Sequence, residues 1–332
     1  MIKQSTKILE SLQYPSGLFA ASSPTVGTGY DKAWIRDCIY ESLGLESVDN
    51  IKAVKKAYTA LLDLLVKHEH KLDHAIESKP EHRFQYIHAR CHPHTLEEID
   101  EPWGNKQNDA VGALLFKIGD LEAKGIELLT KPEYVRVVEK LIGYLASIEY
   151  WHDEDNGMWE ENEEVHASSV GACVAGLLKI RKIVDVPQYL IDKGVATLDA
   201  LLPRESVTKI TDLALLSLIY PYNVVSDEQA KKILHNVEHH LVRKKGVLRY
   251  LDDQYYSNGS EAEWTMGFAW LAIIFKKMGR PDKYAYYMRK TLEVMNAKGE
   301  MPELYFGGTD EYNENTPLGW AQAMYLIAAR ME

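Results

Sequence analysis

Side chains able to do chemistry are concentrated in the long segments between predicted helices and in the first turns after them. They are mostly carboxylates, amides and aromatic rings, with one guanidinium group: Tyr30, Trp34, Arg36, Asp37, His94, Trp103, Gln107, Asn108, Asp109, Trp159, Glu160, Glu161, Trp264, Glu303 and Tyr305. Sugars offer hydroxyl groups to carboxylates, amides and guanidinium groups, and apolar C–H faces to indole and phenol rings. The mixture therefore favours a carbohydrate pocket over a phosphate site.

Two of these carboxyl groups match what glycoside hydrolysis needs, namely one protonated acid and one ionised partner that activates water or attacks carbon. Glu160 follows Trp159, and we expect the apolar indole and the neighbouring carboxylates to raise its pKa, which suits a general acid. Glu303 stands in Met301-Pro302-Glu303-Leu304-Tyr305, just before the last predicted helix, and suits a general base.

Each candidate has a plainer interpretation when it is taken alone. A lone glutamate in a loop is usually solvated surface, and Arg36-Asp37 at a helix start can be a charge pair that stabilises the helix N-terminus. The run from His88 to His94 holds four potential metal ligands, but Pro93 and the alternation of Tyr86, His88 and Arg90 favour an extended strand that lines a cleft. We therefore predict no metal and no other cofactor.

Periodic apolar residues predict the elements that must position these side chains. The pattern indicates twelve helices and very little strand. The predicted ranges are 2–13, 31–47, 50–70, 106–123, 131–150, 165–184, 187–201, 208–219, 226–242, 260–279, 281–297 and 316–331. Ser226 with Gln229 is typical of a capping box at a helix start.

The connections alternate between tight turns and long segments, and this regularity predicts a closed ring. Long segments at about 14–30, 71–105, 151–164, 243–259 and 298–315 precede most even-numbered helices. Six helical hairpins with every second helix inside would bring these segments to one face, around the N-terminal ends of the inner helices. The sequence thus predicts an all-α (α/α)6 toroid over residues 1–332 as a single domain. An α-solenoid is the alternative, although no fixed-period repeat is visible.

Composition restricts the class of partner. Lys and Arg number 38 against 49 Asp and Glu, giving a net charge of −11, and the basic residues are dispersed along the chain. We therefore expect no nucleic-acid partner. The chain has no long uninterrupted apolar run and its N-terminal residues are not those of a signal peptide, so we expect a cytoplasmic protein with no membrane partner.

Several of these segments resemble the glucoamylase-type glycoside hydrolases of family fifteen, and still more closely the family-fifteen-like domain of the phosphorylase kinase α and β subunits. The matching segments run in the same order over nearly the whole chain: 14–22, Lys32-Ala33-Trp34-Ile35-Arg36-Asp37, Gln107-Asn108-Asp109-Ala110, Asn156-Gly157-Met158-Trp159-Glu160, Glu263-Trp264, Pro302-Glu303-Leu304-Tyr305 and 317–322.

The resemblance implies roles for particular residues. Glu160 inherits the general acid and Glu303 the general base of an inverting, exo-acting glucosidase, and Arg36 with Asp37 would hold the terminal glucose. The remaining predicted substrate-binding residues are Tyr30, Trp34, Trp103, Gln107, Asn108, Asp109, Trp159, Glu161, Trp264 and Tyr305. The expected substrate is a short α-glucan or α-glucoside.

Two other functions remain open on the same sequence. The phosphorylase kinase subunits share these motifs and are regulatory, so a non-catalytic glucan-binding or regulatory module is one alternative. Another (α/α)6 sugar enzyme, such as an epimerase or a lyase, is the second, because one fold serves several chemistries.

Overall fold

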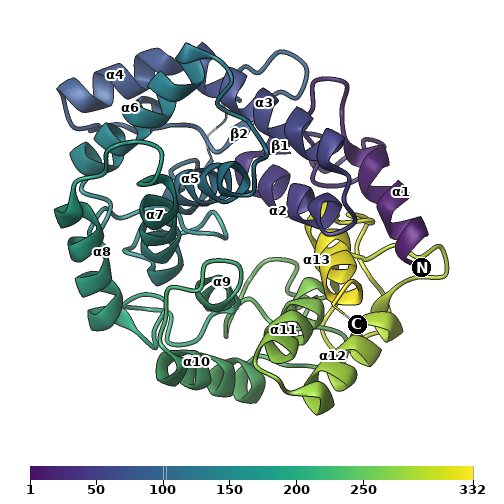
Figure 1. Ribbon diagram of the computed structural model, residues 1–332. Helices are drawn as coiled ribbons and strands as arrows, with labels where there is room; N and C mark the ends of the chain where they lie inside the picture. The colour runs from purple at the N-terminus through teal and green to yellow at the C-terminus, as the bar shows by residue number, and fades with distance from the viewer. Residues whose placement is uncertain (100, 102, 332) are drawn as a thin grey trace.

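The computed structural model describes residues 1–99, 101 and 103–331, and within them the predicted ring of helical hairpins is present (Figure 1). The helices are α1 (Ile2–Leu12), α2 (Ile35–Glu46), α3 (Ile51–Lys67), α4 (Glu69–Glu77), α5 (Asn108–Ala123), α6 (Pro132–Ile148), α7 (Ala167–Ile180), α8 (Gln188–Leu201), α9 (Leu216–Ile219), α10 (Asp227–His240), α11 (Met266–Lys277), α12 (Pro281–Val294) and α13 (Gly319–Ala329). The fold is an (α/α)6 toroid, as the sequence predicted.

The inner layer consists of α2, α5, α7, α9, α11 and α13, each in contact with the next, and α13 closes the ring against α2. Helices such as α7, α11 and α13 are buried on nearly every side, which explains their apolar character all round. Outer helices such as α3 and α6 bury one stripe and expose the other. The core therefore lies between the two layers and in the middle of the ring.

Four predicted helices differ from the structure. The ranges 31–47 and 260–279 begin too early, since α2 starts at Ile35 and α11 at Met266. The range 50–70 ends at Lys67, and a separate helix, α4, occupies Glu69–Glu77 inside the predicted loop 71–105. The range 208–219 is helical only from Leu213, as one 3₁₀ turn followed by α9. The capping box of Ser226 and Gln229 at the start of α10 is confirmed.

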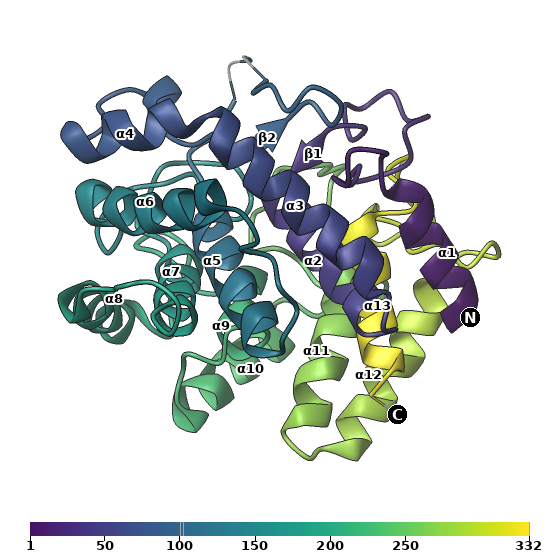
Figure 2. The same ribbon diagram turned by 45° about the horizontal axis from the view of Figure 1, so that its top comes forward.

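Short strand pairs hold the long segments together at one mouth of the ring. Strand β1 (Ala33–Trp34) pairs antiparallel with β2 (Arg90–Cys91), and β3 (Glu263–Trp264) pairs antiparallel with β4 (Leu304–Tyr305). Figure 2 shows β1 and β2 on the edge of the molecule opposite the turn that joins α11 to α12. Each pair ties the segment before one inner helix to a segment far away in sequence.

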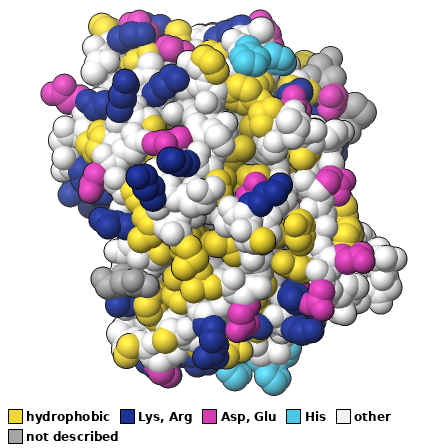
Figure 3. Space-filling model, turned by 90° about the vertical axis from the view of Figure 1, so that its right-hand side faces the viewer, with side chains coloured by type: hydrophobic (Ala, Val, Ile, Leu, Met, Phe, Trp, Pro, Cys, Tyr) yellow, Lys and Arg dark blue, Asp and Glu magenta, His cyan; other side chains and the backbone are white. Residues whose placement is uncertain are grey.

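Side chains of several kinds share the surface of the molecule. On the face shown in Figure 3, basic, acidic, hydrophobic and uncharged side chains all occur together. None of the helices in the described part of the chain combines the length and apolar character needed to cross a membrane.

Candidate active site

A cavity of about 490 Å³ opens at the N-terminal ends of the inner helices. Its lining comes from the segments before α2, α5, α7, α11 and α13: Ala21, Thr28, Tyr30, Trp34, Arg36, Asp37, Arg90, Trp103, Met158, Trp159, Glu160, Glu161, Arg249, Tyr255, Trp264, Glu303, Leu318 and Trp320. The predicted acid and base therefore border the same cavity, although 143 residues separate them in the sequence.

Glu303 is fully buried in the cavity wall, and both of its carboxylate oxygens accept hydrogen bonds. Tyr30 donates its hydroxyl to Oε1 at 2.7 Å, while Asn315 donates to Oε2 at 2.8 Å and Asn313 donates to the same oxygen. Burial raises the pKa of Glu303, and these three donors oppose that rise. The donors also fix the orientation of the carboxylate.

Glu160 lies in the segment before α7, and its side chain is 20% exposed, toward the cavity. Arg36 donates from Nη2 to Oε1 of Glu160 at 3.1 Å. Burial raises the pKa of Glu160 to about 7, with Arg36 lowering it and Asp37 raising it. A protonated carboxyl group is therefore available to the cavity near neutral pH.

The backbone of the segment around Glu160 is held by buried polar contacts. Glu160 has a φ of 64°, a left-handed conformation that a non-glycine residue keeps only where its surroundings fix it. Asn156 donates its N–H to the Lys106 carbonyl and accepts from the Lys106 N–H through Oδ1. Asp155 accepts a hydrogen bond from the His166 ring at 3.0 Å. Burial lowers the pKa of His166, but the contact with Asp155 outweighs burial and raises this pKa to about 9. These contacts fix the position of the segment that carries Glu160, the predicted general acid.

Arg36 and Asp37 begin α2 on the cavity floor. Arg36 donates from Nη1 to Gln107 at 2.7 Å and to Asp109 at 3.1 Å, in addition to its bond with Glu160. Burial raises the pKa of Asp37 to about 6, and Arg36 opposes the rise. Arg36 and Asp37 stand in the first turn of α2, as a charge pair at a helix start would, but both side chains are also buried in the cavity wall.

Glu161, unlike Glu160, has its carboxylate occupied by two ion pairs and a hydrogen bond. Its carboxylate pairs with Arg249 at 2.9 Å and Lys209 at 2.7 Å, and it accepts from the hydroxyl of Tyr250 at 2.8 Å. The neighbouring carboxylate that raises the pKa of Glu160 is thus Asp37, from α2, and not Glu161 as the sequence order indicated.

Aromatic rings form much of the remaining wall. Trp159 lies 5.8 Å from Trp264 and 6.2 Å from Trp320, between ring centroids, and Trp34 lies 6.0 Å from Trp103. Trp159 donates its Nε1 proton to Asp212 at 2.8 Å, which fixes the ring. Flat apolar faces and polar groups therefore alternate around the cavity, as sugar binding requires.

Four residues predicted to bind substrate do not line the cavity. Gln107 and Asp109 lie behind Arg36 and hold its guanidinium group. Asn108 donates its side-chain amide to Asp153, and Tyr305 donates its hydroxyl to the Val294 carbonyl. None of these four side chains is therefore placed to contact a ligand in the cavity directly.

Several lining or supporting residues were not predicted: Arg90, Arg249, Tyr255, Asn313, Asn315 and Trp320. Trp320 stands in a segment that carried part of the resemblance, and the predicted strand through Arg90 already faced a cleft. Arg249 lies in an irregular segment, and its partner Glu161 stands 88 residues away in the sequence, so only the structure brings them together.

The histidines of the 88–94 run do not assemble a metal centre. Nδ1 of His88 accepts from the Arg90 N–H, and the His88 ring stacks near Trp103. Within the described ranges, no three His, Cys, Asp or Glu side chains are grouped as metal ligands.

Comparison with known proteins gives matches over the whole fold. The skeletal muscle phosphorylase b kinase regulatory subunit alpha of Oryctolagus cuniculus is 25% identical over 381 residues, covering 91% of this chain. A probable regulatory subunit alpha of the same kinase from Caenorhabditis elegans is 25% identical over 372 residues, covering 89%. The chain spans about 30% of the length of each of these relatives.

Solved structures share the architecture at low sequence identity. A wild-type glycosidase superposes with a TM-score of 0.86 at 19% identity, over 99% of this chain and 95% of that one. A bacterial glucoamylase complexed with acarbose gives 0.76 at 15% identity, over 98% of this chain and 54% of that one. The profile of Glycosyl hydrolases family 15 matches residues 2–188, more than half of the chain. The chain therefore belongs to glycosyl hydrolases family 15.

Proposed function

We propose that the chain is an inverting, exo-acting glucosidase that releases glucose from the non-reducing end of short α-glucans or α-glucosides. The observation that carries the proposal is the pair of carboxyl groups, Glu160 and Glu303, in one cavity but in different surroundings. Residues 1–332 act as one domain in this proposal. Three buried, unpaired cysteine thiols support a reducing compartment such as the cytoplasm.

In the proposed reaction, the glycosidic oxygen takes the proton of Glu160 as the bond to the anomeric carbon breaks. A water molecule attacks that carbon from the opposite face and gives its proton to Glu303. The products are glucose and the shortened chain, with Glu160 ionised and Glu303 protonated, and one proton returns from Glu303 to Glu160 through solvent. No other reactant is needed.

The hydrogen bonds around Glu303 are compatible with the role of base. Asn313 and Asn315 donate to Oε2, whereas Oε1 accepts from Tyr30 and keeps a second lone pair that can take a proton from water. The fixed donors hold the carboxyl group in place during this transfer. Arg36 and Asp37, on the floor, suit the hydroxyl groups of a terminal glucose, which supports exo action.

The names of the relatives favour a second candidate function, a regulatory module that binds glucan without turnover, since the matched subunits are called regulatory. Both candidates use the same cavity. They differ in whether bound oligosaccharide is cleaved, which an assay decides directly.

The first product released should be β-glucose. Incubation with maltose, isomaltose and trehalose, followed by anomer-resolved NMR in the first minutes, tests both turnover and stereochemistry. Inversion requires the carboxyl groups of Glu160 and Glu303 to be roughly 6.5–9.5 Å apart, with room for water. Formation of the α anomer from the glucose residue whose anomeric carbon is attacked would contradict the assigned base. Saturable binding of these sugars without glucose release would support the regulatory module instead.

The pH dependence of turnover should follow the two carboxyl groups. Glu160 works protonated, so kcat/KM should fall as pH rises through about 7, the pKa that burial gives this group. Glu303 works ionised, so the rate should fall on the acidic side as its raised pKa is crossed. Initial rates across buffers of constant ionic strength check this profile. A rate that stays constant from neutral to alkaline pH would remove Glu160 from the acid role.

A further inference from the structure

A second cavity, of about 650 Å³, lies at the other mouth of the ring. Its lining comes from the C-terminal ends of the inner helices, including Glu46 of α2, Asp120 of α5, Lys179 of α7 and Lys277 of α11. The proposed catalytic cavity opens at the N-terminal ends of the same helices. The two cavities therefore occupy opposite mouths and share no lining residue.

Five lysines line this second cavity, and only two carboxylates stand among them. The lysines are Lys117, Lys124, Lys179, Lys182 and Lys277, and the carboxylates are Glu46 and Asp120. The excess of three positive charges contrasts with a net charge of −11 for the chain. A concave, low-dielectric wall concentrates such a local field at the cavity mouth.

The carboxylates organise the lysines and do not neutralise them. Lys117 pairs with Glu46 at 2.8 Å and Asp120 at 2.7 Å, although its side chain is only 1% exposed. Lys124 pairs with the same two carboxylates at 2.6 and 2.8 Å, and Lys179 reaches Asp120 at 3.3 Å. Among the described residues, neither Lys182 nor Lys277 has an ion-pair partner.

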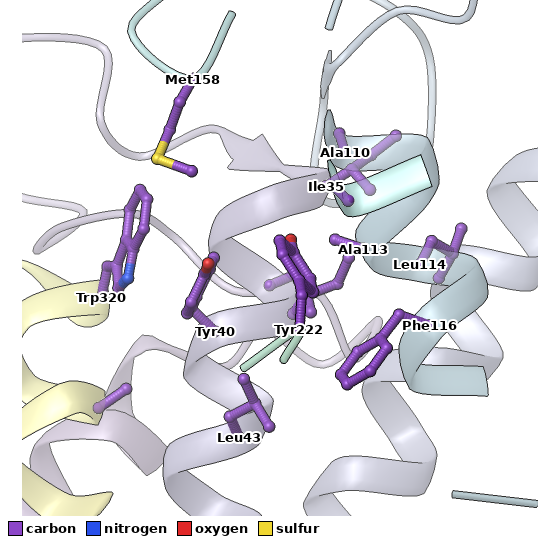
Figure 4. Packing of buried hydrophobic residues seen from close by; sticks show 14 of the residues in the cluster. Ile35, Tyr40, Leu43, Ala110, Ala113, Leu114, Phe116, Met158, Tyr222 and Trp320 are labelled. Atoms are coloured by element: carbon purple, nitrogen blue, oxygen red, sulfur yellow. The ribbon is translucent and has the colours of Figure 1, made fainter. Parts of the chain in front are cut away.

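Most of the rest of the wall is aromatic and apolar, with Ser47 and Asn223 as its uncharged polar members. Phe116 and Tyr222 pack edge to face with centroids 5.3 Å apart, and Figure 4 shows Tyr222 between Tyr40 and Phe116. Lys179 lies over Phe116 at 5.5 Å, and Lys277 lies over Tyr220 at 5.8 Å. Ammonium groups thus surround a floor against which a flat organic group can pack.

Helix capping is the plainer explanation, because cations stabilise helix C-termini. That explanation accounts for lysines in last turns at a solvated surface. It does not account for a cavity of this volume, for a buried lysine held by two carboxylates, or for the aromatic floor. Capping also predicts that these lysines affect stability alone, whereas a binding site predicts an effect on ligand affinity.

We infer that this second cavity is a binding site for a small organic phosphate, a phosphate ester carried on a ring. The phosphate group would meet the exposed Lys182 and Lys277, with the buried Lys117 behind them, while the ring would pack on the apolar wall beside Phe116 and Tyr222. A hexose phosphate and a nucleoside phosphate share this chemistry. The site requires no turnover, so it stands or falls separately from the proposed glucosidase activity.

Calorimetric titration of the intact chain with glucose 6-phosphate and, separately, with adenosine 5′-triphosphate tests the inference and distinguishes the two sources. Excess glucose is present throughout, so that a glucose ring does not enter the catalytic cavity. We expect saturable 1:1 binding of at least one of them, about tenfold tighter than inorganic phosphate. The double variant Lys182→Gln/Lys277→Gln should weaken it by about tenfold or more.

A matched control removes the same charge elsewhere. Lys193 and Lys231 are exposed, lie outside the second cavity and form no ion pair within the described part of the chain. Lys193→Gln/Lys231→Gln should therefore change the affinity by less than about twofold. Equal weakening by both double variants would mean diffuse electrostatic attraction and would overturn the site. So would inorganic phosphate binding as tightly as both esters, or no saturable binding at all.

Discussion

Glu303→Gln should lower turnover on any accepted glucoside by about a hundredfold or more, because the amide cannot take a proton from the attacking water. Gln keeps the size of Glu and can still pair with Tyr30, so the fold should survive. The loss should be similar for maltose and for an activated aryl glucoside, since both need the same water. Steady-state rates on the two substrates, with circular dichroism of each protein, measure this.

Glu314→Gln is the matched control for that variant. Glu314 stands between Asn313 and Asn315 in the same segment, but its side chain is exposed and bonds to Tyr256. It should retain near-normal turnover. If Glu303→Gln also retains it while the parent is active, Glu303 is not the base, and a sugar enzyme of another class that relies on His or Tyr becomes the better assignment.

Glu160→Gln should produce a loss that depends on the leaving group. Turnover of maltose should fall by about a hundredfold or more, because the departing sugar oxygen needs a proton. The acidic phenol of an activated aryl glucoside leaves without that proton, so turnover of this substrate should fall much less. The alkaline fall in rate near pH 7 should also disappear, since the group responsible for it no longer titrates.

The control for the acid is Glu163→Gln, three residues further along the same segment, where the side chain is exposed and pairs with Arg83. Its rates and its pH profile should match those of the parent. An equal loss of rate on both substrates in Glu160→Gln would indicate a binding role for Glu160 and leave the proton donor unassigned.

The fold was predictable because its main signals are local. An inner helix that is apolar all round, such as α11, and an outer helix with one apolar stripe, such as α3, differ in periodicity along the chain. The boundary between α3 and α4 was missed because residues 67–71 are all polar, so no apolar periodicity marks the point where the backbone turns at His68. The predicted helix 208–219 began too early because residues 208–212 form a loop, in which Ile210 is exposed and Asp212 caps the 3₁₀ turn that starts at Leu213.

The site was predictable only where a local motif carried it. Glu160 and Glu303 stand in short segments with a family resemblance, and both border the cavity. The partners of Glu303 lie 10, 12 and 273 residues away, so no spacing along the chain announces them. Tyr305 stands two residues from Glu303 in the sequence but does not line the cavity, because its hydroxyl is bonded to the backbone of another segment.

Closure of the ring by α13 affects how the molecule is made during translation. The Trp320 ring of α13 stacks on Tyr40 of α2 at 4.4 Å and lies 5.7 Å from Trp270 of α11. While the last hairpin is still inside the ribosome, Tyr40 and Trp270 lack this ring, and the segment carrying Glu303 is not yet in place. A nascent chain that still lacks α13 therefore exposes apolar inner helices and has no complete cavity, and exposed apolar surface of this kind makes a folding intermediate prone to aggregation.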